Sequence, residues 1–420
     1  MAYALLALLV RLGLVLTAGG ARGAYQAGVL KRLGEIPALG DGPSPFAIVA
    51  GASAGAINGA MLAAGGATFR EATSEVARLW SELRVEQVFR TDLLTLGLGA
   101  AGLVRDLILG GLVGTTVTSS FVDAAPLRAL IARIMPKGAV AEAIARGHLY
   151  ALAITATSYH SGRSFTFVQG RPGHPIWTKS RRVVMPVEIT ADHVCASAAI
   201  PLVFPPVAIN CAGGDLYFGD GGLRLVTPCS PAIRLGATRL LAIGIRSARA
   251  ADALSREELG AAEETGAQGA YLTPPPLAQI CGVFLNAIFL DHLDTDLDHL
   301  KRMNELILSY QGRAELRPSE SPAALREPMR LVTPCTIGPS EDLALVAERC
   351  AHRMPRLLRY LMDGLGTPDA QSADLMSYLL FDASYTRALV DIGYRDAGQR
   401  IDEIEAFLQL RPSEAAALAG

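Results

Sequence analysis

Short apolar segments alternate with helix-like segments along the first 245 residues of the chain. The apolar runs at 12–16, 46–50 and 238–245 are short and continuous, which predicts buried strands. The small-residue segment 54–64 follows the second run and ends at two glycines, which predicts a helix. Strands separated by helices favour an α/β fold with a mainly parallel sheet covered on both faces.

Strand and helix signals continue beyond these elements. Residues 149–159 and 163–168 predict two strands joined by a turn around Gly162. Residues 246–276 form a polar, Ala- and Glu-rich link that ends in three prolines, which is typical of a surface connection. We expect a long helix after this link, then a strand at 329–334, then helices to the end of the chain.

The composition restricts the kinds of partner. Half of the 420 residues are hydrophobic, enough for a large core, and the formal net charge is -2 with the arginines dispersed along the chain. A nucleic-acid surface needs a concentrated basic stripe, so we expect no nucleic-acid partner and instead a small or apolar one. The six cysteines include no C-x-x-C pair, which favours a reduced, cytosolic setting.

Two other apolar segments raise the question of a membrane. Residues 1–10 lack a basic region and Arg11 ends their apolar run, which argues against a cleaved signal peptide and leaves an uncleaved signal or anchor as the alternative. The stretch 92–117 carries Arg105 and Asp106 at its middle, so no uncharged run reaches the roughly 18 residues of a membrane span. We therefore expect no membrane-spanning helix there.

The loop after the first strand, residues 18–23 (AGGARG), is the first candidate for chemistry. A dinucleotide-binding loop needs G-x-G-x-x-G, but the first aligned position is Ala18, and the second strand ends without the carboxylate that binds the ribose. Backbone N–H groups at the start of a helix favour a negative charge, either a phosphate or an oxyanion. Beside a nucleophile, the oxyanion is the better interpretation.

A G-x-S-x-G motif follows the second strand and places Ser53 between Gly51 and Gly55. A serine at such a strand-to-helix turn forms a nucleophile elbow, which holds its hydroxyl at the carboxyl edge of the sheet. The loops after adjacent parallel strands meet at that edge, so the amides of Gly19 and Gly20 would face Ser53. Alone, the motif also fits a serine in a glycine-rich helix start.

A serine nucleophile needs a proton acceptor, usually a histidine. His292, His299 and His352 come late enough in the chain, but none carries a signature. The leucine spacing around the first two predicts a solvated amphipathic helix and no metal site. Asp220 follows a short apolar strand and precedes two glycines, where it fits either a hairpin turn or a carboxylate that takes the serine proton directly.

Together these residues resemble the patatin-like phospholipases. That family combines a glycine-rich oxyanion loop, a G-x-S-x-G elbow, an AS-x-A-x-P-x-x-F-x-P block and a D-G-G or D-G-A motif. The chain has all four in the family's order, at 18–23, 51–55, 196–206 and 220–222. The resemblance implies a three-layer α/β/α sandwich and a Ser-Asp dyad that requires no metal and no cofactor.

By this resemblance Ser53 is the catalytic nucleophile and Asp220 is the base. The other implied site residues are the oxyanion-hole residues Gly19, Gly20, Arg22 and Gly23 and the elbow glycines Gly51 and Gly55. Arg22 would add a cationic donor or support the loop, and a solvated arginine on the helix surface is the alternative. Ala18 departs from the family, which has glycine there, and a glycine-only backbone angle at this position would weaken the oxyanion hole.

The sequence thus predicts a cytoplasmic serine lipid acyl hydrolase that cleaves carboxyl esters of phospholipids or lysophospholipids and contacts membrane surfaces transiently. We expect a catalytic domain over 12–345, with its motifs within 12–245, and a helical C-terminal region over 346–420. Residues 92–114 either line the acyl groove or belong to the core. The alternatives are an acyltransferase, whose elbow would carry histidine in place of Ala52, and a weakly catalytic or lipid-binding protein that kept the fold.

Overall fold

The structure of the chain is a computed structural model. It describes residues 11–90, 122–179, 182–201, 203–211, 213–247, 292–311, 330–350 and 376–409. The expectations for residues 1–10 and 92–114, for most of the link at 246–276 and for His352 lie outside these residues.

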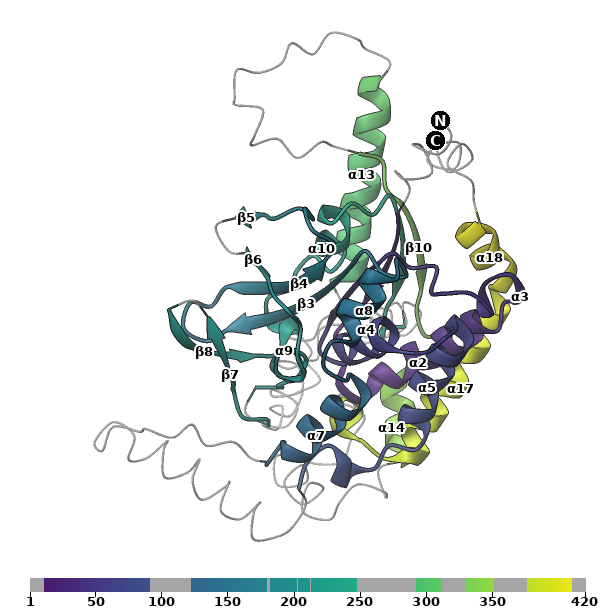
Figure 1. Cartoon of the computed structure of the whole chain (residues 1–420). Coiled ribbons are helices and arrows are strands. Elements are labelled where there is room, and N and C mark those ends of the chain that lie inside the picture. The colour runs from purple at the N-terminus through teal and green to yellow at the C-terminus, as the bar shows by residue number, and fades with distance from the viewer. Residues whose placement is uncertain are drawn as a thin grey trace, which may run out of the picture.

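A mixed sheet of ten strands runs through the described residues (Figure 1). The strands are β1 (Leu12–Leu16), β2 (Ile48–Ala52), β3 (Ala151–Ser158), β4 (Ser164–Gly170), β5 (Thr178–Lys179), β6 (Arg182–Pro186), β7 (Val207–Cys211), β8 (Gly214–Gly219), β9 (Arg239–Ile243) and β10 (Thr333–Ile337). Its centre is the parallel block β10-β9-β1-β2-β3, and β4, β6 and β5 extend it beyond β3. The hairpin β7–β8 joins it where β8 pairs antiparallel with the end of β3.

Helices cover both faces of this sheet. The described α-helices are α2 (Gly23–Gly34), α3 (Pro37–Gly40), α4 (Ala54–Ala64), α5 (Phe69–Ser81), α7 (Ala125–Ile134), α8 (Ala139–Ala145), α9 (Ala191–Ser197), α10 (Ser230–Arg234), α13 (Leu293–Gln311), α14 (Leu343–Cys350), α17 (Ala383–Gln399) and α18 (Ile401–Gln409). Successive strand residues point to opposite faces. Leu14 and Leu16 of β1 therefore share a buried cluster with α2, α4, α5 and α17, whereas Val15 shares one with α10 and α13. The expected α/β fold is confirmed.

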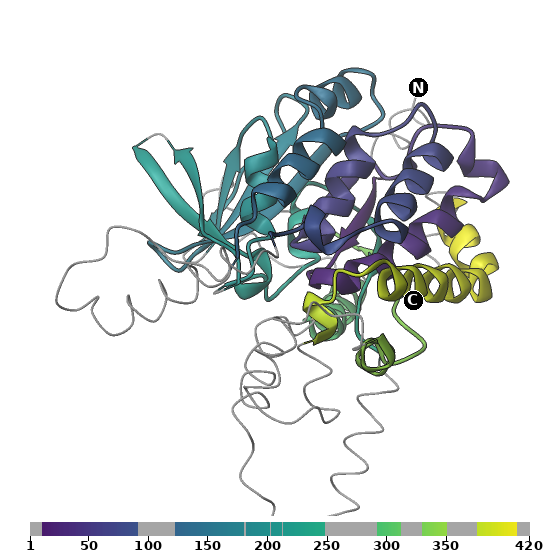
Figure 2. The ribbon, with the colours of Figure 1, turned by 90° about the horizontal axis from the view of Figure 1, so that it is seen from below.

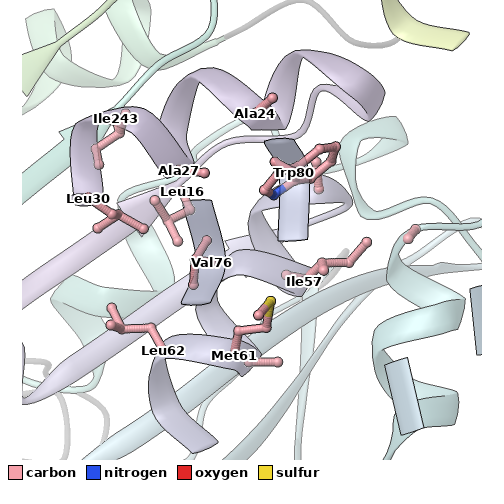
Figure 3. Close-up of a cluster of buried hydrophobic side chains, with 14 of the residues drawn as sticks. Leu16, Ala24, Ala27, Leu30, Ile57, Met61, Leu62, Val76, Trp80 and Ile243 are labelled. Atoms are coloured by element: carbon pink, nitrogen blue, oxygen red, sulfur yellow. The ribbon is translucent and has the colours of Figure 1, made fainter. Parts of the chain in front are cut away.

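The larger of these clusters joins the elements that carry the motifs. Figure 3 shows side chains of β1, β9, α2, α4 and α5 meeting in one apolar layer. Among them are Leu16, Leu30, Ile57, Val76 and Ile243. Burial of these side chains fixes the loop after β1 and the loop after β2 against each other.

Several expected elements occur as predicted. The first strand and the helix at 54–64 have the expected bounds, and β3 and β4 form an antiparallel pair with Gly162 at φ 60 in their turn. The strand expected at 329–334 lies further along the chain. It begins at Thr333, because it pairs in register with β9 from Arg239 onward. Strands β5, β6 and β7 were not predicted.

Helix α17 lies along α2, although the two are more than 300 residues apart in the chain (Figures 1 and 2). A Cβ at Gly28 would lie 2.0 Å from the Val390 carbonyl oxygen, and one at Gly393 would lie 2.1 Å from that of Tyr25. The two helix backbones therefore approach as closely as they do because glycine occupies both positions.

Candidate active site

Ser53 occupies the turn between β2 and α4. It has φ 54 and ψ -124 and is the one residue other than glycine with positive φ in the described parts of the chain. A Cβ at Gly51 would lie 2.3 Å from the Gly55 carbonyl oxygen, and one at Gly55 would lie 2.2 Å from that of Leu16. The strained turn thus depends on both flanking glycines, as a nucleophile elbow does.

The Ser53 hydroxyl meets Asp220, which lies 167 residues further along the chain. Ser53 Oγ donates to Asp220 Oδ2 at 2.6 Å, and both residues are buried. Asp220 follows β8 directly, and its Oδ1 accepts the Gly222 N–H at 2.7 Å. The Thr157 hydroxyl donates to the Asp220 carbonyl oxygen at 2.8 Å. The carboxylate is therefore held in one orientation toward the serine.

Burial strongly affects the ionisation of this carboxyl group. Loss of solvent raises the pKa of Asp220 from its ordinary value of 3.8 to about 7, although the hydrogen bonds from Ser53 and Gly222 act in the opposite direction. Its carboxylate thus has a far higher proton affinity than an exposed aspartate. A base with a pKa near the working pH is well suited to accept a proton from a hydroxyl.

Ser197 has a position in the site that the sequence did not reveal. Its Oγ accepts the Ser53 N–H at 3.0 Å and donates to the Thr155 carbonyl oxygen at 2.5 Å, and the side chain is fully buried. It comes from the end of α9, within the AS-x-A-x-P block at 196–206. Ser197 thereby ties the elbow to β3.

The loop after β1 lies beside the serine. Gly20 begins a short 3-10 helix (Gly20–Arg22) with φ 53, and a Cβ there would lie 2.3 Å from the Tyr378 carbonyl oxygen. Gly20 and Ser53 line the same cavity. Ala18 does not have positive φ, so its backbone angle is one that alanine adopts without strain. The departure from the family pattern at Ala18 thus imposes no glycine-only angle.

Arg22 is buried, which excludes the solvated alternative. Its Nε donates to Ser377 Oγ at 2.7 Å, and its Nη1 donates to the Tyr378 hydroxyl at 3.4 Å. Its guanidinium carbon also lies 4.2 Å from the centre of the Tyr378 ring. These contacts tie the loop at 18–23 to the segment before α17, so Arg22 supports the position of the loop.

A buried polar network joins the same loop to α4 and α5. Asn58 Nδ2 donates to the Gly23 carbonyl oxygen and to Gln26 Oε1, both at 3.0 Å. Asn58 Oδ1 accepts the indole N–H of Trp80 at 2.6 Å. A satisfied network of this kind fixes the relative positions of its elements.

The cavity at Ser53 is mostly apolar. Its walls come from α4, α5, α7, the segment after α9 and the segment before α17. They include Ile57, Trp80, Leu127, Ile131, Phe204 and Phe381. The arrangement brings a polar pair, Gly20 of the loop after β1 and an apolar cavity to one place at the carboxyl edge of the sheet.

Fold and site together define an α/β protein with a serine nucleophile elbow at the edge of a mixed, mostly parallel sheet. The model of the family described as "Patatin-like phospholipase" matches residues 14–233, which is more than half of the chain. The chain belongs to this family of lipid acyl hydrolases. No curated protein sequence matches it.

Solved structures that match the chain come from bacteria and from human. VipD from Legionella pneumophila is 13% identical with a TM-score of 0.33, over 94% of this chain and 67% of VipD. Human GIVD cytosolic phospholipase A2, in complex with methyl gamma-linolenyl fluorophosphonate, is 15% identical with a TM-score of 0.37, over 98% of this chain. The match spans 60% of the human chain. ExoU of Pseudomonas aeruginosa, solved with SpcU, is 15% identical with a TM-score of 0.23, over 88% of this chain and 74% of that one.

Within the described ranges, no helix is both long enough and apolar enough to cross a membrane.

Proposed function

We propose that the protein is a serine hydrolase of phospholipid or lysophospholipid carboxyl esters, with Ser53 as nucleophile and Asp220 as base. The observation that carries the proposal is the 2.6 Å hydrogen bond between these two buried side chains at a strained elbow. Such a turn holds the hydroxyl where it can attack an ester carbonyl, and its hydrogen-bond partner is positioned to take the proton.

The first half-reaction uses this pair. Asp220 Oδ2 accepts the Ser53 proton while Oγ bonds to the ester carbonyl carbon, and the carbonyl oxygen becomes an oxyanion. Collapse of this intermediate breaks the bond to the alkoxy oxygen, and Asp220 returns its proton to the leaving alcohol. The fatty acyl group then remains on Ser53 as an ester.

Backbone amides are the donors that we assign to the oxyanion. Gly19 and Gly20 supply them from the loop after β1, and Ala54 adds the first amide of α4, where a helix leaves its N–H groups without intrahelical partners. Arg22 and Gly23 belong to the same loop, with Arg22 as a positioning residue. In the second half-reaction Asp220 takes a proton from a water molecule while the water oxygen bonds to the acyl carbon. The bond between that carbon and Ser53 Oγ then breaks, Asp220 returns its proton to Oγ, and the fatty acid leaves.

The apolar cavity supports a fatty acyl substrate. An acyl chain that packs against side chains such as Ile57, Leu127 and Phe204 would have its carbonyl end next to Ser53. A charged acyl group would lose its hydration in this cavity.

We place the enzyme in the cytoplasm, where free thiols persist, because the described cysteines form no disulfide. Contact with membranes would be transient.

The test is fatty-acid release from a lipid extract. Wild type, Ser53→Ala and Asp220→Asn proteins with matching thermal melting curves are incubated with the extract, and released fatty acids and lysolipids are measured by mass spectrometry. We expect release by wild type and none above background by either variant. Equal release by wild type and Ser53→Ala would refute the assignment.

A further inference from the structure

The turn between β3 and β4, together with β8, forms a surface that the proposed reaction does not use. The described residues leave six large apolar side chains exposed, and two of them, Tyr159 at 44% and Tyr217 at 46%, lie side by side here. The Tyr159 N–H donates to the Tyr217 carbonyl oxygen at 2.9 Å, which continues the pairing of β3 with β8. His160 adds a ring whose centre lies 5.9 Å from that of Tyr217.

This surface adjoins the proposed base. Tyr217 and Gly219 lie on the same face of β8, because alternate strand residues share a face. A Cβ at Gly219 would lie 2.1 Å from the Tyr159 hydroxyl, so the ring of Tyr159 reaches the strand end that leads into Asp220. Partial burial of Tyr159, and then the charge of Asp220, raise its pKa to about 12. Tyr159 therefore stays neutral beside the site.

Two arginines extend the surface. Arg163 follows the turn and Arg224 comes four residues after Asp220, and both are exposed. A Cβ at Gly162 would lie 3.6 Å from Arg224 Nη2, so this guanidinium lies against the turn. Neither arginine forms a salt bridge with a carboxylate of the described residues. The surface thus combines aromatic rings with positive charge.

We propose that Tyr159, His160, Arg163, Tyr217 and Arg224 form a docking surface for an anionic phospholipid layer. Tyrosine combines an apolar body with a polar tip, which suits it to the boundary between lipid and water. Arginine binds phosphate oxygens through parallel N–H donors. The inference rests on the proposed function, because a lipid ester has to leave its layer to reach Ser53, which is 1% exposed.

The test measures vesicle binding of the Ser53→Ala protein, which leaves the lipids intact. Its partition onto vesicles of equimolar phosphatidylcholine and phosphatidylglycerol is compared with that onto pure phosphatidylcholine. We expect binding to the anionic vesicles that falls with added salt. Adding Arg163→Gln and Arg224→Gln should weaken this binding about 25-fold, since each basic residue near such a surface contributes about fivefold. Tyr217→Ser should weaken it as well.

The matched control is Arg146→Gln with Arg171→Gln, also in the Ser53→Ala protein. It changes the net charge equally, but at the opposite end of the β3–β4 pair, where Ala151 faces Gly170. We expect its vesicle binding to match that of Ser53→Ala alone, with equal melting temperatures throughout. Equal binding by the two double variants would overturn the inference, and so would a failure of Ser53→Ala itself to bind the anionic vesicles.

Hydrolysis of a soluble ester separates this inference from the proposed function. With Ser53 present, the Arg163→Gln, Arg224→Gln protein should cleave p-nitrophenyl butyrate at the wild-type rate and vesicle lipids more slowly. Wild type that cleaves neither ester, together with the expected vesicle binding, would refute the function and leave the docking surface standing. Normal cleavage of the soluble ester, together with vesicle binding that the two arginine substitutions leave unchanged, would refute the docking surface alone.

Discussion

The carboxylate of Asp220 is fully buried and accepts hydrogen bonds from the Ser53 hydroxyl and the Gly222 amide. Desolvation outweighs both hydrogen bonds, and the pKa rises to about 7. At neutral pH the group is thus balanced between its neutral and charged forms. In our proposal only the charged form can accept the Ser53 proton, so this balance sets the pH range of the enzyme.

We expect kcat/KM for a soluble ester to rise with pH through about 7 and then to level off, because Asp220 has to be deprotonated in the free enzyme. An aspartate with the ordinary pKa of 3.8 would place this rise some three pH units lower. Initial rates at low substrate concentration, measured across the stable pH range, check this. A profile already flat at pH 5 would contradict the buried base.

The candidate site residues that the sequence predicts are those whose local pattern indicates a chemical role. Ser53 stands in a glycine-flanked turn, and Asp220 stands between a strand and two glycines. Ser197 lies in the block at 196–206, but its role could not be recognised, because that role is a hydrogen bond to a backbone amide 144 residues away. The burial of Arg22 likewise depends on Ser377, 355 residues later, and no local pattern indicates that contact.

At the scale of elements, the loop at 18–23 is held from two sides. Asn58 fixes its C-terminal end against α4, and Arg22 fixes it to the segment before α17. That segment also supplies Phe381 to the cavity and the Tyr378 carbonyl oxygen next to Gly20. The position of the proposed oxyanion donors therefore depends on a part of the chain that carries no motif.

We predict that Arg22→Ala lowers kcat for a soluble ester by about 10² to 10³-fold, the effect of one lost oxyanion donor, with little change in KM. Arg22→Lys should recover part of the loss, since it restores the charge over the Tyr378 ring but not the planar fork. Steady-state kinetics, with thermal melting to verify the fold, measure both effects. A change in KM at constant kcat would assign Arg22 to substrate binding instead.

Elements with a strong internal signal were predicted best. Strand β1 and helix α4 match because a continuous apolar run and a small-residue helix between glycines need no distant partner to be recognised. The bounds of β10 follow from pairing with β9, and β7 is stabilised by β8, which itself pairs with β3. Such pairings are decided by contacts across the sheet, which the local sequence does not contain.

For the molecule as a whole, we propose that the boundary near 345 separates two stretches of sequence within one packing unit. One buried cluster contains Leu14 of β1 together with Tyr385 and Leu408 from the C-terminal helices. The two stretches also approach closely where Gly28 faces the Val390 carbonyl oxygen and Gly393 faces that of Tyr25. The helical region would then be needed for the stability of the catalytic part.

Gly28→Ala tests this dependence. Its Cβ would meet the Val390 carbonyl oxygen at 2.0 Å, so α17 has to move away from α2. We expect the free energy of unfolding to fall by about 1–3 kcal/mol, the usual result of overpacking a core, and esterase activity to fall with it. Chemical denaturation measures the change. Gly213→Ala is the control, because its Cβ would have nothing within 4 Å, and equal stability of the two variants would refute the proposal.

Covalent labelling with a fluorophosphonate tests most directly whether Ser53 is a nucleophile that Asp220 activates. Peptide mass spectrometry locates the adduct, and the rate of its formation is compared between wild type and Asp220→Asn. We predict one adduct, on Ser53, that forms about 10² to 10⁴-fold more slowly in Asp220→Asn, the usual effect of losing a general base. A folded wild-type protein that remains unlabelled at Ser53, or an Asp220→Asn protein labelled at the wild-type rate, would contradict the account.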